Sequence, residues 1–341
     1  MPGLVEFPAT YTAYAFLVPG GKLQKITVPW KFPKAGEIVV KVLACGVCGT
    51  DDICPTQVMP VPLPRVPGHE IVGDVVAVSC QETMWKVGQR VGAGYHGGHC
   101  YTCVRCRAGD YMTCQNQCII GANWDGGYAE YVTLRSEAVV KVPEDMDPAE
   151  AAPLLCAGIS TFNALRNMSI SPPEYVAIQG IGGLGHLAVQ FASAMGFRTI
   201  ALSSDGSKEE LARTLGADEF IDSSKVDQAQ ALQEFGGMKV IMSTAPNANV
   251  TESLIDGLAV NGTLLVLAVE PEPMKISPLS LLVKRLSIRG WPAGSPKDAE
   301  DCLAFVQAKK LKCLVERFPL HKAHEAYAHR ETARFRAVII P

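Results

Sequence analysis

Apolar residues in the first half of the chain occur in short runs separated by turn-forming residues. Residues 37–42 (EIVVKV) and 71–76 (IVGDVV) are two such runs, both rich in β-branched side chains. β-Branched residues favour strands, whereas Gly and Pro favour the turns between strands. Residues 1 to about 150 are therefore predicted to be mostly β.

From about residue 157 to 293 the pattern changes to apolar runs that alternate with helical stretches. The strand candidates are 175–179, 199–202 and 264–269, and the helical candidates are 186–195 and 208–215. This alternation is typical of βαβ units that form a parallel sheet. A doubly wound α/β domain is predicted for this part of the chain.

The last segment, 294–341, has amphipathic stretches at 298–309 and 322–329 and an apolar run at 337–340. It is too short to form a domain of its own, because domains usually exceed 50 residues. We expect it to return to the first half. The predicted domains are thus 1–156, completed by 294–341, and 157–293.

Composition is consistent with two folded domains and argues against two classes of partner. The 341 residues are 48% hydrophobic and 19% charged, which is enough to bury large cores. The formal net charge of −3 leaves no excess of basic residues for nucleic acid or anionic lipid. No apolar run approaches the ~18 residues of a membrane span, and prolines interrupt the N-terminus where a signal peptide would lie.

The chain has twelve cysteines, and several are grouped at the spacing of metal ligands. Disulfide frameworks are typical of small secreted chains, whereas grouped cysteines in a large untargeted chain indicate metal binding. We therefore expect a reducing, cytoplasmic compartment.

Four of these cysteines, Cys100, Cys103, Cys106 and Cys114, fall within fifteen residues. A short loop with four thiolates suits tetrahedral zinc, and such a closed site stabilises the fold around it. Iron–sulfur ligation and unpaired thiols are the alternatives, although no proline follows the last cysteine as in ferredoxin runs. A structural zinc site is predicted here.

A second set, Cys48, His69 and Cys156, is scattered along the chain. Two thiolates and one imidazole would leave zinc an exchangeable fourth position, as in catalytic zinc sites. Single cysteines and histidines are, however, more often buried packing groups. Spacing alone leaves both interpretations open.

A glycine-rich segment, Gly180-Ile181-Gly182-Gly183-Leu184-Gly185, follows a predicted strand and opens a predicted helix. This is the context of the G-x-G-x-x-G dinucleotide fingerprint, in which glycines let the backbone approach the pyrophosphate at a helix N-terminus. The alternative is a glycine-rich turn without a ligand.

Taken in order, these motifs resemble those of the zinc-containing medium-chain alcohol dehydrogenases, and the similarity covers essentially the whole chain. The matching segments are 46–51 (GVCGTD), 67–70 (PGHE), the four-cysteine lobe, 125–131 (DGGYAEY), 155–158 (LCAG) and 180–185 (GIGGLG). The resemblance implies a mostly β GroES-like catalytic domain and a Rossmann domain. It also implies two zinc ions per chain.

The resemblance assigns roles to the scattered residues. Cys48, His69 and Cys156 match the ligands of the catalytic zinc, and Glu70 matches an acid that can act as a transient ligand. Asp51 matches the carboxylate that orients the zinc-bound histidine, and Thr50 matches the hydroxyl that takes the substrate proton.

One position departs from the family pattern. A histidine that passes the proton to water often lies five residues after the first ligand, and here that residue is Ile53. The proton must then leave through water, the cofactor ribose or another group such as Asp52. His96 and His99 lie nearby in sequence, and we expect both to be solvated loop residues.

Cofactor choice is predicted from the residues that follow the second strand of the α/β domain. An NAD site usually has an acid there, which binds the ribose 2′-hydroxyl. The resemblance of residues 208–211 (KEEL) to the family implies that Ser203 stands at this position, with Ser204 next and Asp205 two residues after Ser203. Lys208 adds a positive charge that would attract a 2′-phosphate. We therefore expect NADP(H) in preference to NAD(H).

The remaining cofactor contacts are implied by the family resemblance: Gly180, Gly182, Gly183, Leu184, Gly185, Ser160 for the nicotinamide half, and Arg336 for the phosphates.

The predicted activity is hydride transfer between a small alcohol and its aldehyde or ketone, with a nicotinamide cofactor. Tyr95 matches an aromatic wall of the family's substrate pocket, and Trp124 is a weaker candidate for that pocket. Reduction of activated double bonds on the same fold, or a dinucleotide-binding protein with structural zinc alone, are the alternatives. A homo-oligomer, either tetramer or dimer, is expected without a nucleic-acid or membrane partner.

Overall fold

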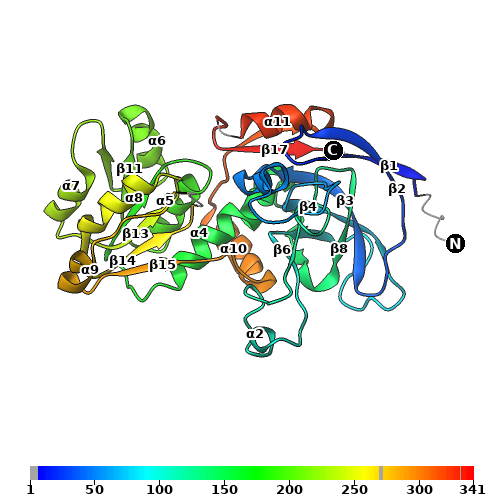
Figure 1. Ribbon diagram of the computed structural model, residues 1–341, viewed down its shortest axis with the longest axis horizontal. Helices are drawn as coiled ribbons and strands as arrows, with labels where there is room; N and C mark the ends of the chain where they lie inside the picture. The colour runs from blue at the N-terminus through cyan, green and yellow to red at the C-terminus, as the bar shows by residue number, and fades with distance from the viewer. Residues whose placement is uncertain (1–6, 269–271, 331) are drawn as a thin grey trace. The chain divides into compact units, whose positions relative to one another are not determined.

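The computed structural model describes residues 7–268, 272–330 and 332–341. The chain divides into two compact units (Figure 1). The first consists of Met1–Cys156 and Gly294–Pro341, and the second of Ala157–Ala293. Each has its own buried apolar cluster, centred in the first on residues such as Phe16 and Tyr128 and in the second on residues such as Ile200 and Ile241.

The first unit is built on a seven-stranded sheet with strand order β16-β17-β3-β4-β5-β9, in which β8 also pairs with β3. The predicted strands 37–42 and 71–76 lie in β3 and β4, which pair antiparallel. The first unit also contains two separate two-stranded sheets, β1-β2 and β6-β7. The elements are β1 Thr10–Ala15, β2 Gln24–Pro29, β3 Glu37–Gly46, α1 Ile53–Thr56, β4 Glu70–Val78, β5 Arg90–Ala93, β6 His96–Gly98, α2 Val104–Arg107, β7 Cys118–Ile119, β8 Tyr131–Arg135, β9 Val140–Lys141 and α3 Pro148–Ala151.

The C-terminal segment returns to this sheet. It forms α10 (Pro296–Lys309), β16 (Val315–Pro319), α11 (Ala323–His329) and β17 (Arg336–Ile340). β17 pairs antiparallel with the end of β3 through Val338 and Ile339. β16 then pairs parallel with β17. The tail therefore brings Arg336 to the end of β3, next to the chain segment that carries Cys48.

The second unit contains a parallel six-stranded sheet with the order β12-β11-β10-β13-β14-β15. Counted within the unit, this is the order 3-2-1-4-5-6 of the dinucleotide-binding Rossmann fold. Helices flank the strands (Figure 1). The elements are α4 Ala157–Arg166, β10 Tyr175–Gln179, α5 Gly185–Ala194, β11 Arg198–Ser203, α6 Glu209–Thr214, β12 Glu219–Asp222, α7 Gln228–Glu234, β13 Met238–Ser243, α8 Ala248–Ser253, β14 Leu258–Val266, α9 Pro278–Lys284 and β15 Ser287–Gly290.

Continuous apolar runs explain the central strands of this unit, because an interior parallel strand is buried on both faces. In β10, four of the five residues are buried. Two predicted bounds differ from the structure. The strand predicted at 264–269 begins earlier and ends at Val266, and Val269 lies outside the described residues. The helix predicted at 208–215 begins as a 3-10 turn, Gly206–Lys208, which Asp205 caps.

None of the helices in the described ranges is long and apolar enough to cross a membrane.

Candidate active site and metal centres

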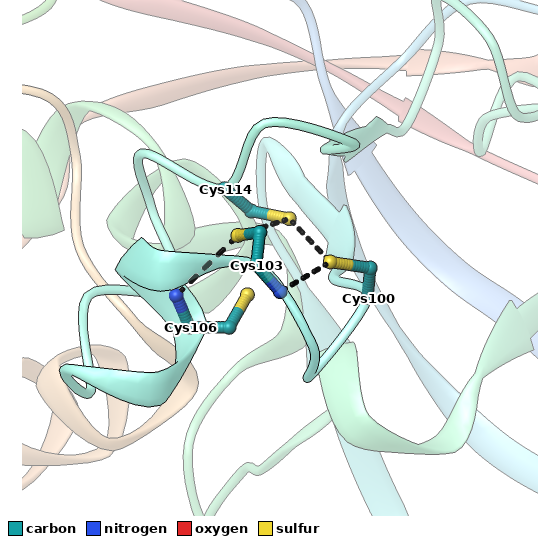
Figure 2. Close-up of side chains that lie close together, drawn as sticks. All are labelled: Cys100, Cys103, Cys106 and Cys114. Atoms are coloured by element: carbon teal, nitrogen blue, oxygen red, sulfur yellow. Dashed lines mark hydrogen bonds between the residues drawn. The ribbon is translucent and has the colours of Figure 1, made fainter.

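The four closely spaced cysteines form one cluster of thiol groups in the first unit (Figure 2). Their sulfur atoms lie within 4.8 Å of one another, with Sγ of Cys114 3.6 Å from Sγ of Cys100 and 4.0 Å from Sγ of Cys103. Cys103 caps α2, and Cys106 lies in that helix. The sequence spacing therefore closes into a compact four-sulfur group of the kind that binds tetrahedral metal.

Backbone N–H groups point at these sulfur atoms. Cys103 N donates to Cys100 Sγ at 3.4 Å, and Cys106 N donates to Cys103 Sγ at 3.5 Å. Asn116 N donates to Cys114 Sγ at 3.3 Å. Hydrogen bonds to a thiolate favour the charged form, and the Thr102 hydroxyl together with the Cys103 N–H lowers the pKa of Cys100 to about 5. The donor set therefore suits a metal held by thiolates.

A second cluster assembles the scattered residues Cys48, His69, Glu70 and Cys156. Cys48 precedes the 3-10 turn Gly49–Asp52, His69 and Glu70 stand at the start of β4, and Cys156 follows the 3-10 turn Ala152–Leu155. Cys156 Sγ lies 3.8 Å from Cys48 Sγ and 3.4 Å from His69 Nε2. The three predicted ligands, far apart in sequence, thus lie at one point.

The Asp51 carboxylate orients His69. Asp51 Oδ1 lies 3.0 Å from Nδ1 of His69, and both side chains are almost fully buried. A proton on Nδ1 shared with the carboxylate leaves the lone pair of Nε2 directed into the cluster, as a metal-binding imidazole requires.

Glu70 provides a separate test of whether the second cluster fits a metal ion. Its side chain is completely buried, and Nη2 of Arg336 donates to its Oε1. Its Oε2 has no hydrogen-bond partner among the described residues. Burial raises the pKa of Glu70 to about 7 against the opposing charge of Arg336. A buried carboxylate oxygen without a partner, beside two thiols and an imidazole, fits a site that accepts a cation.

Arg336, predicted to contact cofactor phosphates, is engaged inside the first unit. Its side chain is 7% exposed and pairs with Glu70, and its own Nε has no partner in the described part of the chain. The pair joins residues 266 positions apart, and sequence reasoning did not foresee it.

The turn that carries the predicted proton acceptor Thr50 also carries Asp52 and is followed by Ile53, and both of these side chains are held by the first unit. Thr50 lies in the 3-10 turn that begins after Cys48, and Ile53 packs against the apolar core. Asp52, one of the predicted proton routes, is bound by two partners. Its Oδ1 accepts a hydrogen bond from the Tyr327 hydroxyl, and its Oδ2 lies 2.9 Å from Nη2 of Arg330.

The two predicted pocket aromatics lie in different surroundings. The ring of Tyr95 lies edge-on to that of His69, with centroids 5.8 Å apart. Trp124 instead donates its indole N–H to the Thr133 carbonyl at 2.6 Å and lines a cavity of about 260 Å³ with Tyr11 and Tyr131. None of the second-cluster residues lines that cavity. Tyr95 therefore lies beside the second cluster, whereas Trp124 lines a separate cavity.

The expectation that His96 and His99 are solvated was wrong. Both side chains are 4% exposed, and Nε2 of His96 lies 3.0 Å from Nδ1 of His99. The His99 ring stacks on Tyr111 with centroids 4.0 Å apart. Pairing across β6 and β7 brings this segment inside, and burial there lowers the pKa of His96 to about 4, with the nearby charges of His99 and Arg135 adding to the effect.

This burial predicts a contribution to acid sensitivity. A histidine whose pKa is lower in the folded state than its ordinary value near 6.5 stabilises the fold above about pH 6.5, and loses that contribution as the pH falls toward 4. Between pH 7.5 and 5 the loss is about 2 kcal/mol.

We expect His96→Gln, which keeps a donor near the position of Nε2 but cannot be charged, to show a smaller drop in melting temperature over that range, by about 5 °C. Calorimetry of parent and variant at both pH values checks this. Equal drops in the two proteins would show that His96 titrates normally. Arg135 and Glu137, which face His99, stay unchanged in both proteins.

The glycine-rich loop lies at the carboxyl end of β10, where Rossmann folds bind their ligand. Gly180 has φ +87°, and a Cβ on Gly185 would lie 1.8 Å from the Gly180 carbonyl oxygen. Both positions therefore require glycine. The helix α5 starts at Gly185, directly after the loop. A cavity of about 430 Å³ adjoins the loop, lined by residues that include Gly180–Gly183, Leu202, Ser203, Ser204 and Lys208.

The residues predicted to set cofactor choice meet at this cavity. Ser203 ends β11 and is 7% exposed, whereas Ser204 is exposed. Nζ of Lys208 donates to the Ile181 carbonyl of the glycine loop at 3.1 Å. The carboxylate of Asp205 is taken up by its own turn, where it accepts from Ser207 N at 2.8 Å.

The cavity also has walls that the sequence analysis missed. Thr244 and Asn247 follow β13, the neighbour of β10, and both line the cavity. The Thr244 hydroxyl donates to the carbonyls of Gln179 and Gly180. The signal that could have found them is their place at the carboxyl end of a parallel strand, since no motif marks them.

Comparisons with known proteins agree with this architecture. A family model described as the alcohol dehydrogenase GroES-like domain matches residues 34–144, and one described as zinc-binding dehydrogenase matches 183–308. An alcohol dehydrogenase, patD of Penicillium expansum, is 47% identical over 334 residues, which are 97% of this chain and 98% of that protein. This chain belongs to the zinc-dependent medium-chain dehydrogenase/reductase family.

As a member of that family the chain is an NAD(P)-dependent alcohol dehydrogenase, and zinc and a nicotinamide nucleotide are its cofactors. Solved structures of other proteins are similar to this chain over almost its whole length. A cinnamyl alcohol dehydrogenase from Sorghum bicolor has a TM-score of 0.88 at 28% identity, covering 97% of both chains. The acetophenone reductase from Geotrichum candidum in complex with NAD has a TM-score of 0.86 at 27% identity, covering 98% of both.

Proposed function

We propose that this enzyme interconverts a small alcohol and its aldehyde or ketone with NADP(H), at a zinc ion held by Cys48, His69 and Cys156. The observation that carries the proposal is the meeting of these three donors from separate chain segments, with Asp51 behind His69. The four-cysteine cluster would hold a second, structural zinc ion. Four thiolates complete a tetrahedral shell, whereas three protein ligands leave one position for substrate.

The roles of the side chains follow from this assignment. When bound, zinc would act as a Lewis acid on the substrate oxygen, and the nicotinamide ring would supply or receive the hydride. The Thr50 hydroxyl holds the proton of the substrate alcohol, and Tyr95 provides an aromatic wall beside His69. Glu70, with its unpaired Oε2, can act as a transient ligand during substrate exchange.

Proton release without a histidine at position 53 is best explained by water or the cofactor ribose. Both carboxylate oxygens of Asp52 are already bound, one by Tyr327 and one by Arg330. We therefore assign Asp52 to holding the turn that carries Thr50.

The proposed preference for NADP(H) rests on the cavity next to the glycine loop. Ser203 and Ser204 can donate hydroxyl hydrogen bonds to a 2′-phosphate, and Lys208 adds positive charge. Asp205, the acid that could bind a ribose instead, is engaged as a cap. Ser160 and the glycines of the loop, with Leu184, are proposed to contact the rest of the dinucleotide. Arg336 is proposed to contact its phosphates, for which its side chain must leave Glu70.

We also propose a cytoplasmic homo-oligomer. Six of the twelve cysteines lie in the two clusters that could hold a metal ion, and reduced, metal-binding thiols are typical of a reducing compartment. Strand β15 is exposed at every position and lies at the edge of its sheet. The adjoining α9 exposes Leu279, Leu282 and Val283 by 67–75%. An exposed edge strand and exposed apolar side chains are often covered by a partner, and a second copy can extend the sheet by strand pairing.

The function is tested with a panel of alcohols, aldehydes and ketones, including cinnamyl and acetophenone-type compounds, assayed with both cofactors. Two zinc ions per chain and carbonyl products are expected. Family membership leaves reduction of activated double bonds as the second candidate, and product analysis with an α,β-unsaturated aldehyde separates the two. A saturated aldehyde product would contradict the proposal. Light scattering on the same preparation measures the oligomer, and a monomer mass would contradict that part.

A further inference from the structure

Tyr128 is a completely buried tyrosine whose hydroxyl contacts a buried carboxylate near the second cluster. It is 0% exposed and belongs to the largest fully buried side chains of the described residues. Its hydroxyl donates to Oδ2 of Asp51 at 2.8 Å. Burial, with the charge of Asp51 next, raises the pKa of Tyr128 well above its ordinary value, so the hydroxyl keeps its proton and remains a donor.

The Asp51 carboxylate binds four donors, two on each oxygen. Oδ1 lies within hydrogen-bond distance of Nδ1 of His69 and accepts from Gly68 N at 3.2 Å. Oδ2 accepts from Cys48 N at 3.0 Å and from the Tyr128 hydroxyl. Three of these donors belong to the two segments that carry Cys48 and His69. Tyr128 comes from a third segment and fixes the carboxylate from outside them.

The backbone before Tyr128 is packed directly on the His69 segment. Gly127 N donates to the Gly68 carbonyl at 2.8 Å, and Tyr128 N donates to the Pro67 carbonyl at 3.2 Å. A Cβ on Gly126 would lie 2.3 Å from the Gly68 oxygen. The two glycines therefore allow a close approach that sets the position of the Tyr128 ring relative to His69.

We propose that Tyr128 is a positioning residue for the zinc ligand His69 and acts on it through Asp51. This inference rests on the metal site of the proposed function. Removal of the hydroxyl would leave Oδ2 with the Cys48 N–H alone in a site closed to water, so the carboxylate would hold the imidazole less firmly. Partners behind a metal-bound histidine change metal affinity by about 10–100-fold. Tyr128 lies one contact farther out, and we expect about tenfold.

The test compares Tyr128→Phe with Tyr14→Phe in the zinc-loaded enzyme. Phe fills the same space as Tyr in both variants. Tyr14 is a matched control, because it is also buried and its hydroxyl donates to a backbone carbonyl, that of His321, at 3.2 Å. Zinc release into excess chromogenic chelator is followed for each protein. We expect one of the two zinc ions to leave Tyr128→Phe about tenfold faster, the ion of the four-cysteine cluster to leave at the parent rate, and Tyr14→Phe to match the parent.

Two further measurements separate positioning from general loosening. Cobalt(II) in the Cys48 site should show a shifted d–d absorption band in Tyr128→Phe and an unshifted band in Tyr14→Phe. In an Asp51→Asn background, Tyr128→Phe should have little additional effect on zinc release, because the two side chains act through one contact.

Zinc release at the parent rate together with an unshifted cobalt band in Tyr128→Phe would overturn the inference. Equal acceleration of zinc release by Tyr128→Phe and Tyr14→Phe would also overturn it, and so would full additivity of Tyr128→Phe with Asp51→Asn. Failure of the proposed function is recognised separately, since the parent would then contain no zinc ion that is lost on changing Cys48. In that case the inference falls together with the metal site.

Discussion

Cys48→Ala is expected to remove one of two zinc ions and to lower kcat/KM by about a thousandfold or more. Its thiol lies 3.8 Å from Cys156 Sγ at the centre of the second cluster, and the Cys156 thiol, with Arg336 and His69, holds its pKa well below the ordinary value. Lewis-acid stabilisation is worth several kcal/mol, and each 1.4 kcal/mol corresponds to tenfold in rate. The fold should survive, because the backbone N–H of residue 48 still donates to Asp51.

Cys103→Ala is the matched control, because it also removes a zinc-ligand thiol but in the other cluster. It should lose the other zinc ion and lower the melting temperature, since metal binding there stabilises a lobe that has only the four-residue helix α2. Zinc content, melting temperature and kcat/KM are measured for both variants. Normal zinc content and turnover in Cys48→Ala would show that Cys48 is not a ligand. An unchanged melt in Cys103→Ala would remove the structural role of its cluster.

Features encoded by local sequence pattern could be predicted well. The strand predicted before the glycine loop, 175–179, has the same bounds as β10. It could be predicted because an apolar run bounded by turn residues is typical of a strand that is buried on both faces. The four-cysteine cluster follows from spacing alone, since a loop of fifteen residues can hardly keep its four thiols apart. β16 was missed because its sequence, VERFP, has no apolar alternation, and pairing with β17 is what makes it a strand.

Contacts between distant residues could not be predicted in the same way. The Arg336–Glu70 pair and the Tyr128–Asp51 hydrogen bond depend on which strands become neighbours, which no local pattern records. The burial of His96 and His99 has the same origin. A histidine in a glycine-rich loop is normally solvated, and only the pairing of β6 with β7 makes this segment an exception. For the scattered ligands, spacing was weak evidence, and the resemblance of the surrounding motifs was needed to select them.

Cofactor preference is the second property for which we expect a large effect. The parent should have the higher kcat/KM with NADP(H), and Ser203→Asp should shift the ratio of the two cofactors about a hundredfold toward NAD(H). Ser203 ends β11 beside the cavity, where a carboxylate would repel a 2′-phosphate and could bind both ribose hydroxyls instead. A hundredfold shift corresponds to about 2.7 kcal/mol, a reasonable size for removing one hydrogen bond to the phosphate and adding a negative charge beside it.

Gln230→Glu is the control, because it adds the same charge to an exposed position of α7 that does not line the cavity. It should leave the cofactor ratio unchanged, which excludes a general effect of net charge. Lys208→Ala should weaken NADP(H) more than NAD(H) if its ammonium, now on the Ile181 carbonyl, turns to the phosphate. Equal weakening of both would mean that Lys208 only supports the glycine loop. A parent that prefers NAD(H) would mean that Asp205 leaves its cap on Ser207 to bind the ribose, because no other acid follows β11 at that distance.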